Sequence, residues 1–185
     1  MTICIFPGTF NPIHLAHIKM AQFALQKYKF EKIIFIPAYL PPHKQVDSNL
    51  SKHRYNMVKL VCDKVSKFEV SDIEYKSENT SYTLITVKKI IEQYNINGRL
   101  NFIIGTDAFS KIRSWYKIDE LKNLVHFIVF PRGEDIIKKE DFEDFSFELV
   151  DADKINISST EMREQHKGET DKEVEEYIAK YELYN

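Results

Sequence analysis

Two histidines three residues apart follow the first apolar segment of the chain, in the stretch PGTFNPIHLAH over residues 7–17. On a helix, His14 and His17 would share one face. The N-terminus of a helix offers unpaired amides and the positive end of its dipole, which favour an anion. We therefore expect both imidazoles to hydrogen-bond one phosphate group, with Gly8 letting the backbone approach the ligand or adopt a positive φ. The alternative is two ordinary surface or capping histidines, and no third ligand for a metal stands nearby.

Two further stretches carry residue types that suit an anion. PPHK at residues 41–44 would present His43 and Lys44 on a proline-stiffened loop, with a solvated loop as the alternative. In ISSTEMR, Ser158 and Glu161 fit a capping box, so a helix begins there. Hydroxyls, first-turn amides and a guanidinium would then converge on a polyphosphate, unless this is a plain capped helix. The side chains concerned are Ser159, Thr160 and Arg163.

Other candidates follow later apolar runs. GTDAF places Gly105 and Asp107 after one of them, where the carboxylate could hold a ribose hydroxyl or a magnesium ion, or cap a helix. Arg132 follows another. Trp115 is the only tryptophan, and the alternatives for it are a core position or stacking on a ligand ring.

The apolar pattern predicts which elements must position these residues. Short apolar runs indicate strands over residues 3–6, 32–36, 100–104 and 125–130, and one strand or two short ones over residues 68–75. Apolar spacings of three and four and helix-start signals indicate helices over residues 14–28, 54–65, 83–94, 107–113, 117–124, 159–166 and 171–183. Such alternation favours an α/β fold with a parallel sheet covered on both faces, in which ligands bind beyond the carboxyl ends of the strands. The acidic residues 134–148 are expected to form an exposed insertion.

Composition narrows the class of protein. With 185 residues the chain is expected to be a single domain, and its net charge of −2 gives no reason to expect nucleic-acid binding. Cys4 and Cys62, the only cysteines, are expected to be buried. No apolar run approaches the length of a membrane span, and no signal segment is evident, so a cytoplasmic protein is expected.

The order of these motifs resembles one known family. GTFNPxHxxH, PPHK, Ser-Tyr-Thr at residues 81–83, Ile-Gly-Thr-Asp at 104–107, Trp115 and ISSTxxR together resemble the bacterial nicotinate-nucleotide adenylyltransferases, of the HxGH nucleotidyltransferase superfamily. The resemblance extends over nearly the whole chain. It implies a Rossmann-like doubly wound fold in a single nucleotidyltransferase domain over residues 1–185, with a helical portion from about 158. It also implies the joining of ATP to nicotinate mononucleotide, with magnesium, to give deamido-NAD and pyrophosphate.

The resemblance further implies a role for each matching residue. The catalytic contacts to phosphate would come from His14, His17, Lys44 and Arg163. ATP would be bound by these histidines and by Gly8, Thr9, Phe10, Gly105, Asp107, Ser159, Thr160 and Arg163. Nicotinate mononucleotide would be bound by His43, Lys44, Thr83, Trp115, Tyr116 and Arg132, with Trp115 stacking on the pyridine ring. No protein metal ligand is implied, and the oligomeric state is left open, with a homodimer among the states it allows.

Three departures from the family pattern bear on the fit of the nucleotide. Ala16 replaces the glycine of HxGH, Pro7 stands where a second glycine is frequent, and Asn11 stands where aspartate is common. None of them removes a side chain that the chemistry needs. The rival interpretations are another member of the superfamily, such as a pantetheine-phosphate adenylyltransferase or a cytidylyltransferase, and a nucleotide-binding module without catalysis.

Overall fold

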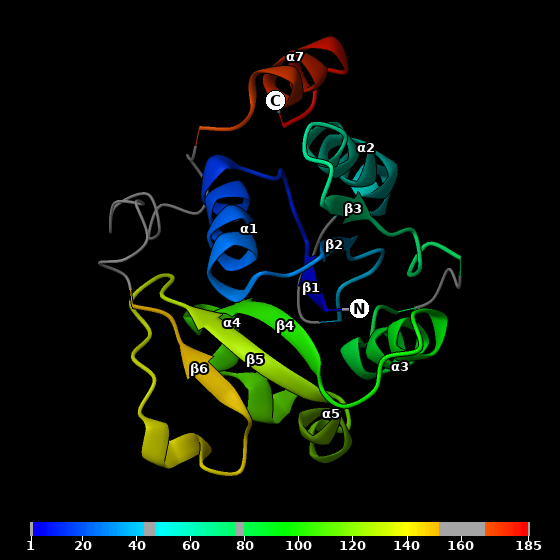
Figure 1. Ribbon diagram of the computed structural model, residues 1–185. Helices are drawn as coiled ribbons and strands as arrows, with labels where there is room; N and C mark the ends of the chain where they lie inside the picture. The colour runs from blue at the N-terminus through cyan, green and yellow to red at the C-terminus, as the bar shows by residue number, and fades with distance from the viewer. Residues whose placement is uncertain (1, 43–46, 77–79, 152–168, 185) are drawn as a thin grey trace.

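A parallel β-sheet runs through the middle of the protein (Figure 1). The structure is a computed structural model that describes residues 2–42, 47–76, 80–151 and 169–184. Within these residues the sheet has six strands in the order β3-β2-β1-β4-β5-β6, and every neighbouring pair is parallel. The strands are β1 (Ile3–Gly8), β2 (Lys32–Pro37), β3 (Phe68–Val70), β4 (Leu100–Gly105), β5 (Val125–Phe130) and β6 (Phe147–Leu149).

Helices cover both faces of this sheet (Figure 1). One face packs against α1 (Leu15–Tyr28) and α2 (Ser51–Cys62), and α7 (Lys172–Lys180) packs on α2. The other face packs against α3 (Thr83–Gln93), α4 (Thr106–Phe109) and α5 (Ile118–Leu124). Short 3-10 turns lie at η1 (Ser48–Leu50), η2 (Ile112–Ser114) and η3 (Lys139–Phe142). The predicted doubly wound α/β fold is therefore confirmed.

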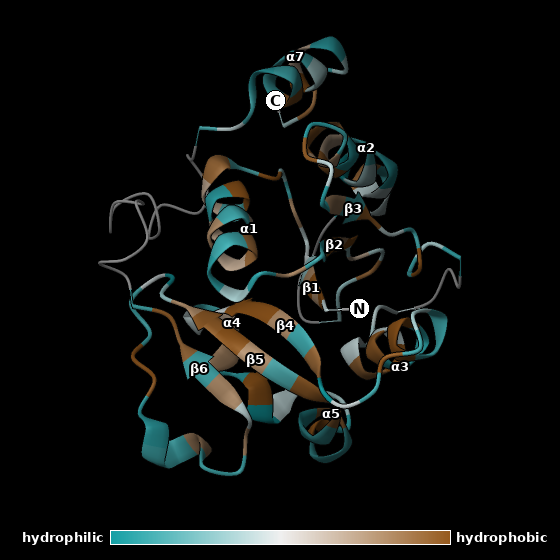
Figure 2. Cartoon of the chain, viewed as in Figure 1, coloured by the Kyte–Doolittle hydropathy of each residue, from teal (hydrophilic) through white to brown (hydrophobic). Residues whose placement is uncertain are grey.

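Alternation along the strands divides the core in two. Cys4 and Phe6 of β1 belong to the cluster under α1 and α2, whereas Ile3 and Ile5 belong to the cluster under α3 and α5. Successive side chains of a strand point to opposite faces, so a strand covered on both sides is apolar throughout. The strands β4 and β5 are accordingly mostly hydrophobic in colour in Figure 2. Cys4 and Cys62 are both buried, as expected, and burial raises the pKa of the Cys62 thiol to about 12.

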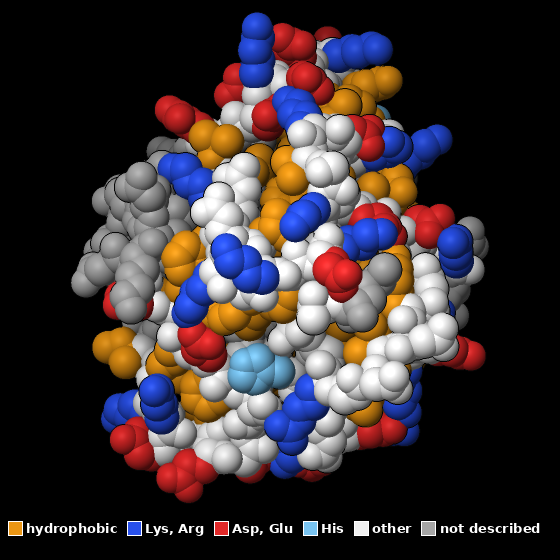
Figure 3. All heavy atoms as spheres, viewed as in Figure 1, with side chains coloured by type: hydrophobic (Ala, Val, Ile, Leu, Met, Phe, Trp, Pro, Cys, Tyr) orange, Lys and Arg blue, Asp and Glu red, His pale blue; other side chains and the backbone are white. Residues whose placement is uncertain are grey.

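The outer surface mixes charges of both signs. On the face shown in Figure 3, basic and acidic side chains are interspersed, with hydrophobic side chains between them. This mixture agrees with a net charge near zero. Across the described part of the chain, no helix combines the length and the apolar character that crossing a membrane requires.

Several predicted boundaries need correction. Residues 68–75 form a strand only over Phe68–Val70, because Asp72 and the residues after it turn back through local hydrogen bonds. The helix expected over residues 107–113 is divided into α4 and η2, and the last helix ends at Lys180 rather than near residue 183. The helix expected over residues 159–166 lies outside the described residues.

The prediction of an exposed insertion over residues 134–148 holds for most of residues 134–141, which are exposed, but is wrong for the residues that follow. Phe142 and Phe145 are buried, and the stretch ends in β6, which pairs with β5. The Phe142 ring lies 4.9 Å from that of Phe109, so the phenylalanines of this stretch close the second core. The acidic side chains face outward, where Arg113 forms an ion pair with Asp144. In the sequence, the many charged residues of this stretch made the apolar spacing of Phe142 and Phe145, three residues apart, easy to overlook.

We expect Phe142→Ala to destabilise the protein by about 3–5 kcal/mol, because it removes a buried ring and leaves a cavity. Chemical denaturation would measure the change in the free energy of unfolding. Ile136→Ala is the matched control in the same stretch, since Ile136 is 85% exposed, and its cost should be within about 0.5 kcal/mol. Equal effects of the two substitutions would contradict this account of residues 134–148.

Candidate functional site

The carboxyl ends of β1 and β4 meet at the point where the sheet changes direction. The chain builds β1, β2 and β3 outward on one side and then returns to pair β4 with β1. In open parallel sheets this switch point is where the loops diverge and ligands bind. Gly8 ends β1 and Gly105 ends β4. The structure therefore brings the first motif and the GTDAF motif to one edge of the sheet.

The two histidines lie at the start of α1 and contact each other. His14 is the N-cap residue, and His17 lies in the first turn. Their rings stack with centroids 3.6 Å apart, and each residue is about 5% exposed: His14 6%, His17 5%. The His14 main-chain amide donates to Nδ1 of His17 over 3.3 Å. An accepting Nδ1 carries no proton, so the neutral His17 ring is protonated on Nε2, where it is a donor.

The Phe10 ring explains why residue 8 is glycine. A Cβ at Gly8 would lie 2.9 Å from Cζ of Phe10, which is closer than real Cβ contacts come. Gly8 does not adopt the positive φ that the sequence allowed for it. The residue of this loop with a positive φ is Phe10, at 47°. Phe10 is 2% exposed and packs edge-on against Phe6 and His17. Its backbone, rather than its ring, is the part that a ligand could contact.

The ends of β4 and β5 place a carboxylate beside a guanidinium. Arg132 Nε lies 3.9 Å from Asp107 Oδ2, and a Cβ at Gly105 would lie 2.5 Å from Asp107 Oδ1. Thr106 donates from its hydroxyl to the Arg132 carbonyl over 2.6 Å and accepts from the Arg132 amide over 2.8 Å. Burial lowers the pKa of the Arg132 guanidinium, while Asp107 acts in the opposite direction. The glycine therefore leaves room for this charged pair at the edge.

The residues predicted to form a pyridine pocket lie near α3. Thr83 is the first residue of α3, and its neighbour Tyr82 has its ring centroid 4.6 Å from that of Tyr116. Tyr116 is 43% exposed. Trp115 is half-buried and packs against the core cluster that contains Phe102. The tryptophan thus has a packing role, and its stacking on a ligand remains a prediction.

Five predicted site residues lie outside the described residues: His43, Lys44, Ser159, Thr160 and Arg163. The described flanks of the later gap both reach the switch-point edge. Val150 follows β6 and donates to the Val129 carbonyl of β5. Glu169 accepts from the Leu15 amide at the start of α1, and the Thr170 hydroxyl donates to the Ile13 carbonyl.

A buried polar group that no sequence motif marked lies behind the edge. Glu74 is 7% exposed and accepts from the Tyr39 amide over 3.2 Å and from the Thr86 hydroxyl over 2.8 Å. Burial raises the pKa of Glu74, and its hydrogen bonds, together with the Arg54 charge, partly oppose this. Arg54 itself is fully buried. In the sequence, the signal for a buried Arg54 was its position on the apolar side of a helix, three and four residues before Met57 and Val58.

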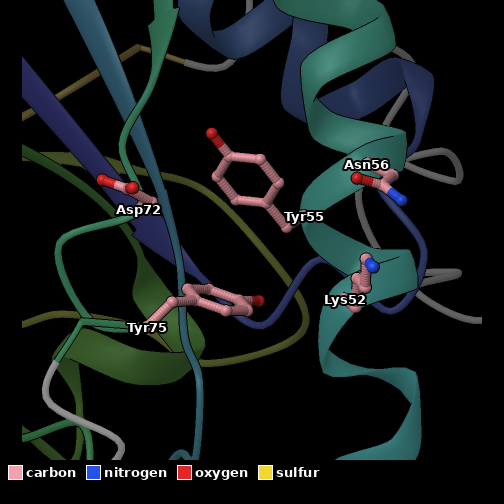
Figure 4. Close-up of a pocket in the computed structure, with 5 residues that line it drawn as sticks. All are labelled: Lys52, Tyr55, Asn56, Asp72 and Tyr75. Carbon is pink, nitrogen blue, oxygen red and sulfur yellow. The ribbon is translucent and has the colours of Figure 1, made fainter.

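An open pocket lies between α2 and the loop after β3 (Figure 4). Its lining is Lys52, Tyr55, Asn56, Asp72 and Tyr75. The Tyr75 hydroxyl already donates to the Ser51 carbonyl over 2.8 Å, and burial raises its pKa to about 12. None of the motifs singled out in the sequence lines this pocket, so the switch-point edge is the stronger candidate site.

Comparison with known proteins shows the family of this chain. Residues 5–165 match the model of the cytidylyltransferase-like family. A protein of Caldicellulosiruptor saccharolyticus named as a probable nicotinate-nucleotide adenylyltransferase is 36% identical, with 100% of this chain and 99% of the relative covered. One of Clostridium tetani with the same name is 40% identical, with 97% of each chain covered. The match spans the switch-point edge as well as the sheet.

A solved structure shows the same fold. The nicotinic acid mononucleotide adenylyltransferase of Plasmodium falciparum, complexed with NaAD, superposes with a TM-score of 0.78 at 24% identity, covering 99% of this chain and 97% of that one. The fold and the switch-point edge define a Rossmann-like nucleotidyltransferase architecture. The chain belongs to the cytidylyltransferase-like family, among the relatives named as probable nicotinate-nucleotide adenylyltransferases.

We expect Glu74→Gln to flatten the pH dependence of stability above pH 4.5. The pKa of Glu74 in the folded protein is raised above its ordinary value of 4.5. Its stabilising contribution is therefore complete below that value and is lost as the pH rises through the folded-state pKa. Urea denaturation across this range should show the wild type losing more stability than Glu74→Gln as the pH rises. Parallel profiles of the two proteins would refute the raised pKa of Glu74. Glu143→Gln, at an exposed position, is the control for the loss of one negative charge.

Proposed function

We propose that the protein transfers the adenylyl group of ATP to nicotinate mononucleotide, giving deamido-NAD and pyrophosphate. The observation that carries this proposal is the similarity, over the whole chain, to relatives named for this activity. The geometry supports it, because donors and one ion pair lie together at the switch point of the sheet. That arrangement suits a ligand with several phosphates and a nucleoside.

The reaction needs positioning more than covalent chemistry. A phosphate oxygen of the mononucleotide attacks the α-phosphorus of ATP, a new P–O bond forms, and the bond to the β-phosphate bridging oxygen breaks. Pyrophosphate carries away the bonding electrons, so no bond to the protein is required. Catalysis of such transfers comes from alignment and from neutralisation of developing charge. Hydrogen-bond donors that already point at the reacting phosphates serve this purpose.

On the ATP side, the donors come from the start of α1. The Nε2–H of His17 would donate to a phosphate oxygen, because its Nδ1 is occupied by the His14 amide. His14 stacks on this ring and would contact the same phosphates. The backbone at Gly8, Thr9 and Phe10 would approach the nucleotide. Gly105 and Asp107 would hold the adenosine, and Ser159, Thr160 and Arg163 the outer phosphates.

On the mononucleotide side, the proposed contacts come from the loop after β2, the start of α3 and the segment before α5. Thr83 and the exposed Tyr116 would bind the nicotinate end, with Trp115 packing behind or against the ring. His43 and Lys44 would bind the phosphate. Arg132, which lies beside Asp107, would also contact the mononucleotide.

A magnesium ion would accompany ATP. Among the described residues no group of three or more His, Cys, Asp or Glu could hold a metal ion. The side chains at the edge are mainly donors, which suit phosphate rather than a cation. They would therefore hold the phosphates, while a bound magnesium ion would neutralise phosphate charge, and Asp107 is the carboxylate at this edge that could contact it.

The domain organisation and the cellular compartment of the protein belong to the same proposal. We propose that residues 1–185 act as one nucleotidyltransferase domain with a helical portion from about residue 158, since Val174 of α7 packs into the core under α2. We also propose that the protein acts in the cytoplasm, where ATP and the mononucleotide are available to it.

Pyrophosphate release is the experiment that tests this function. The protein is incubated with ATP and magnesium, and with nicotinate mononucleotide, nicotinamide mononucleotide or phosphopantetheine as the acceptor. We expect release with nicotinate mononucleotide far above that with the other two. Release only with another acceptor would overturn the substrate, and ATP binding without release by any acceptor would favour a non-catalytic binding module.

We expect His17→Ala to lower turnover by about 10²–10³-fold, because one preorganised donor to the phosphates is lost. The measurement is the steady-state rate at saturating substrates, with circular dichroism to establish folding. His126→Ala is the matched control, since His126 lies near the amino end of β5, away from the switch-point edge. Near-normal turnover of a folded His17→Ala protein would remove His17 from the mechanism.

A further inference from the structure

Arg54 of α2 is fully buried and lies beside a hydrophobic core. Arginine is almost never fully buried unless its charge is compensated. Here the guanidinium donates to main-chain carbonyls: Nη1 to the carbonyls of Thr9 over 2.8 Å and Ala38 over 2.6 Å, and Nη2 to that of Tyr39 over 3.1 Å. These bonds join α2 to backbone carbonyls of residues that belong to no helix or strand.

The three carbonyls belong to the loops after β1 and β2. Gly8 and Pro37 are register partners at the ends of these strands, and the Ala38 amide donates to the Gly8 carbonyl over 2.9 Å. Thr9 follows Gly8 directly and leads to the histidines of α1. Arg54 therefore links the loop proposed for ATP to the loop next to the proposed mononucleotide site.

The amides of the same loop are held from the opposite side. Ser81 Oγ accepts from the Tyr39 amide over 3.0 Å and from the Leu40 amide over 3.1 Å, and Glu74 also accepts from Tyr39. The Ser81 amide donates to the Leu40 carbonyl over 2.9 Å. Every main-chain amide and carbonyl of residues 38–40 thus has a hydrogen-bond partner, so no polar group of this backbone segment is left unsatisfied.

This arrangement also connects to the start of α3. Ser81 lies two residues before Thr83, which begins that helix. Residues 38–40 and Thr83 are therefore held to each other by the Ser81 bonds, while residues 38–40 and Thr9 are held by Arg54. Burial lowers the pKa of Arg54, and the charge of Glu74 acts in the opposite direction.

We infer that Arg54 is a positioning residue for both nucleotides, with Ser81 as its counterpart on the mononucleotide side. The inference rests on the proposed function. Arg54 does not touch the reacting atoms, because it is buried behind the loops. It aligns the two substrate loops through their carbonyls, and misplacement of a loop by about 1 Å can cost on the order of 10²-fold in rate.

Arg54→Lys tests this inference, because lysine keeps the charge but cannot reach three carbonyls with a planar fork. We expect kcat/KM for ATP and for nicotinate mononucleotide both to fall by on the order of 10²-fold. Ser81→Ala should raise the KM for the mononucleotide by about tenfold and leave the KM for ATP close to wild type. All rates are measured far below the melting temperature of each variant.

Val61→Ala is the matched control, since it truncates another buried side chain of α2, an apolar one that can form no hydrogen bond to the loops. It should lower the melting temperature yet leave both kcat/KM values close to wild type. If Arg54→Lys behaves like Val61→Ala, the inference is overturned. If Arg54→Lys does not fold, Ser81→Ala decides: an unchanged KM for the mononucleotide overturns the inference, and a selective rise supports it. A wild-type protein inactive with this acceptor would instead show that the proposed function has failed.

Discussion

The structure depends on the parallel pairing of β1 with β2 on one side and with β4 on the other. Parallel pairing puts the carboxyl ends of all strands at one edge, and the loops that follow β1 and β4 diverge there because the order of the strands reverses between them. Residues far apart in the chain, such as His14 and Asp107, share this edge for that reason. The two apolar faces of the strands require helices on both sides, so the same pairing also determines the two-sided core.

A ligand edge made of loops raises a second physical problem, since loop amides and carbonyls lack the partners that a sheet supplies. Here buried polar side chains supply them. Arg54 donates to three carbonyls, and Ser81 and Glu74 accept from two amides. Removing charged groups from water is costly, and these hydrogen bonds offset that cost. The result is a loop whose backbone is held on both sides, as a site that works by positioning needs.

Much of this could be predicted from local patterns. The strands from β1 to β5, the main helices and the buried cysteines were predicted because apolar periodicity reports burial directly. The motifs placed His14, His17 and Asp107 at strand ends. The acidic stretch was misjudged, because charge frequency concealed Phe142 and Phe145, and β6 is too short to show alternation. Phe10 stays a predicted contact of ATP through its backbone, since its ring is buried against Gly8 and His17.

The amino-acid sequence by itself determined the fold class, the family pattern and the strand ends that carry polar residues, because each depends on the order of residues along a short segment. Only the tertiary structure decided which loops are joined. The contacts of Arg54 with Thr9 and Tyr39, the stacking of the two histidines and the pair of Asp107 with Arg132 all arise where separate elements meet. A buried arginine looks like any other charged residue in the sequence. Its partners are main-chain carbonyls, which every residue carries, so no residue type marks them beforehand.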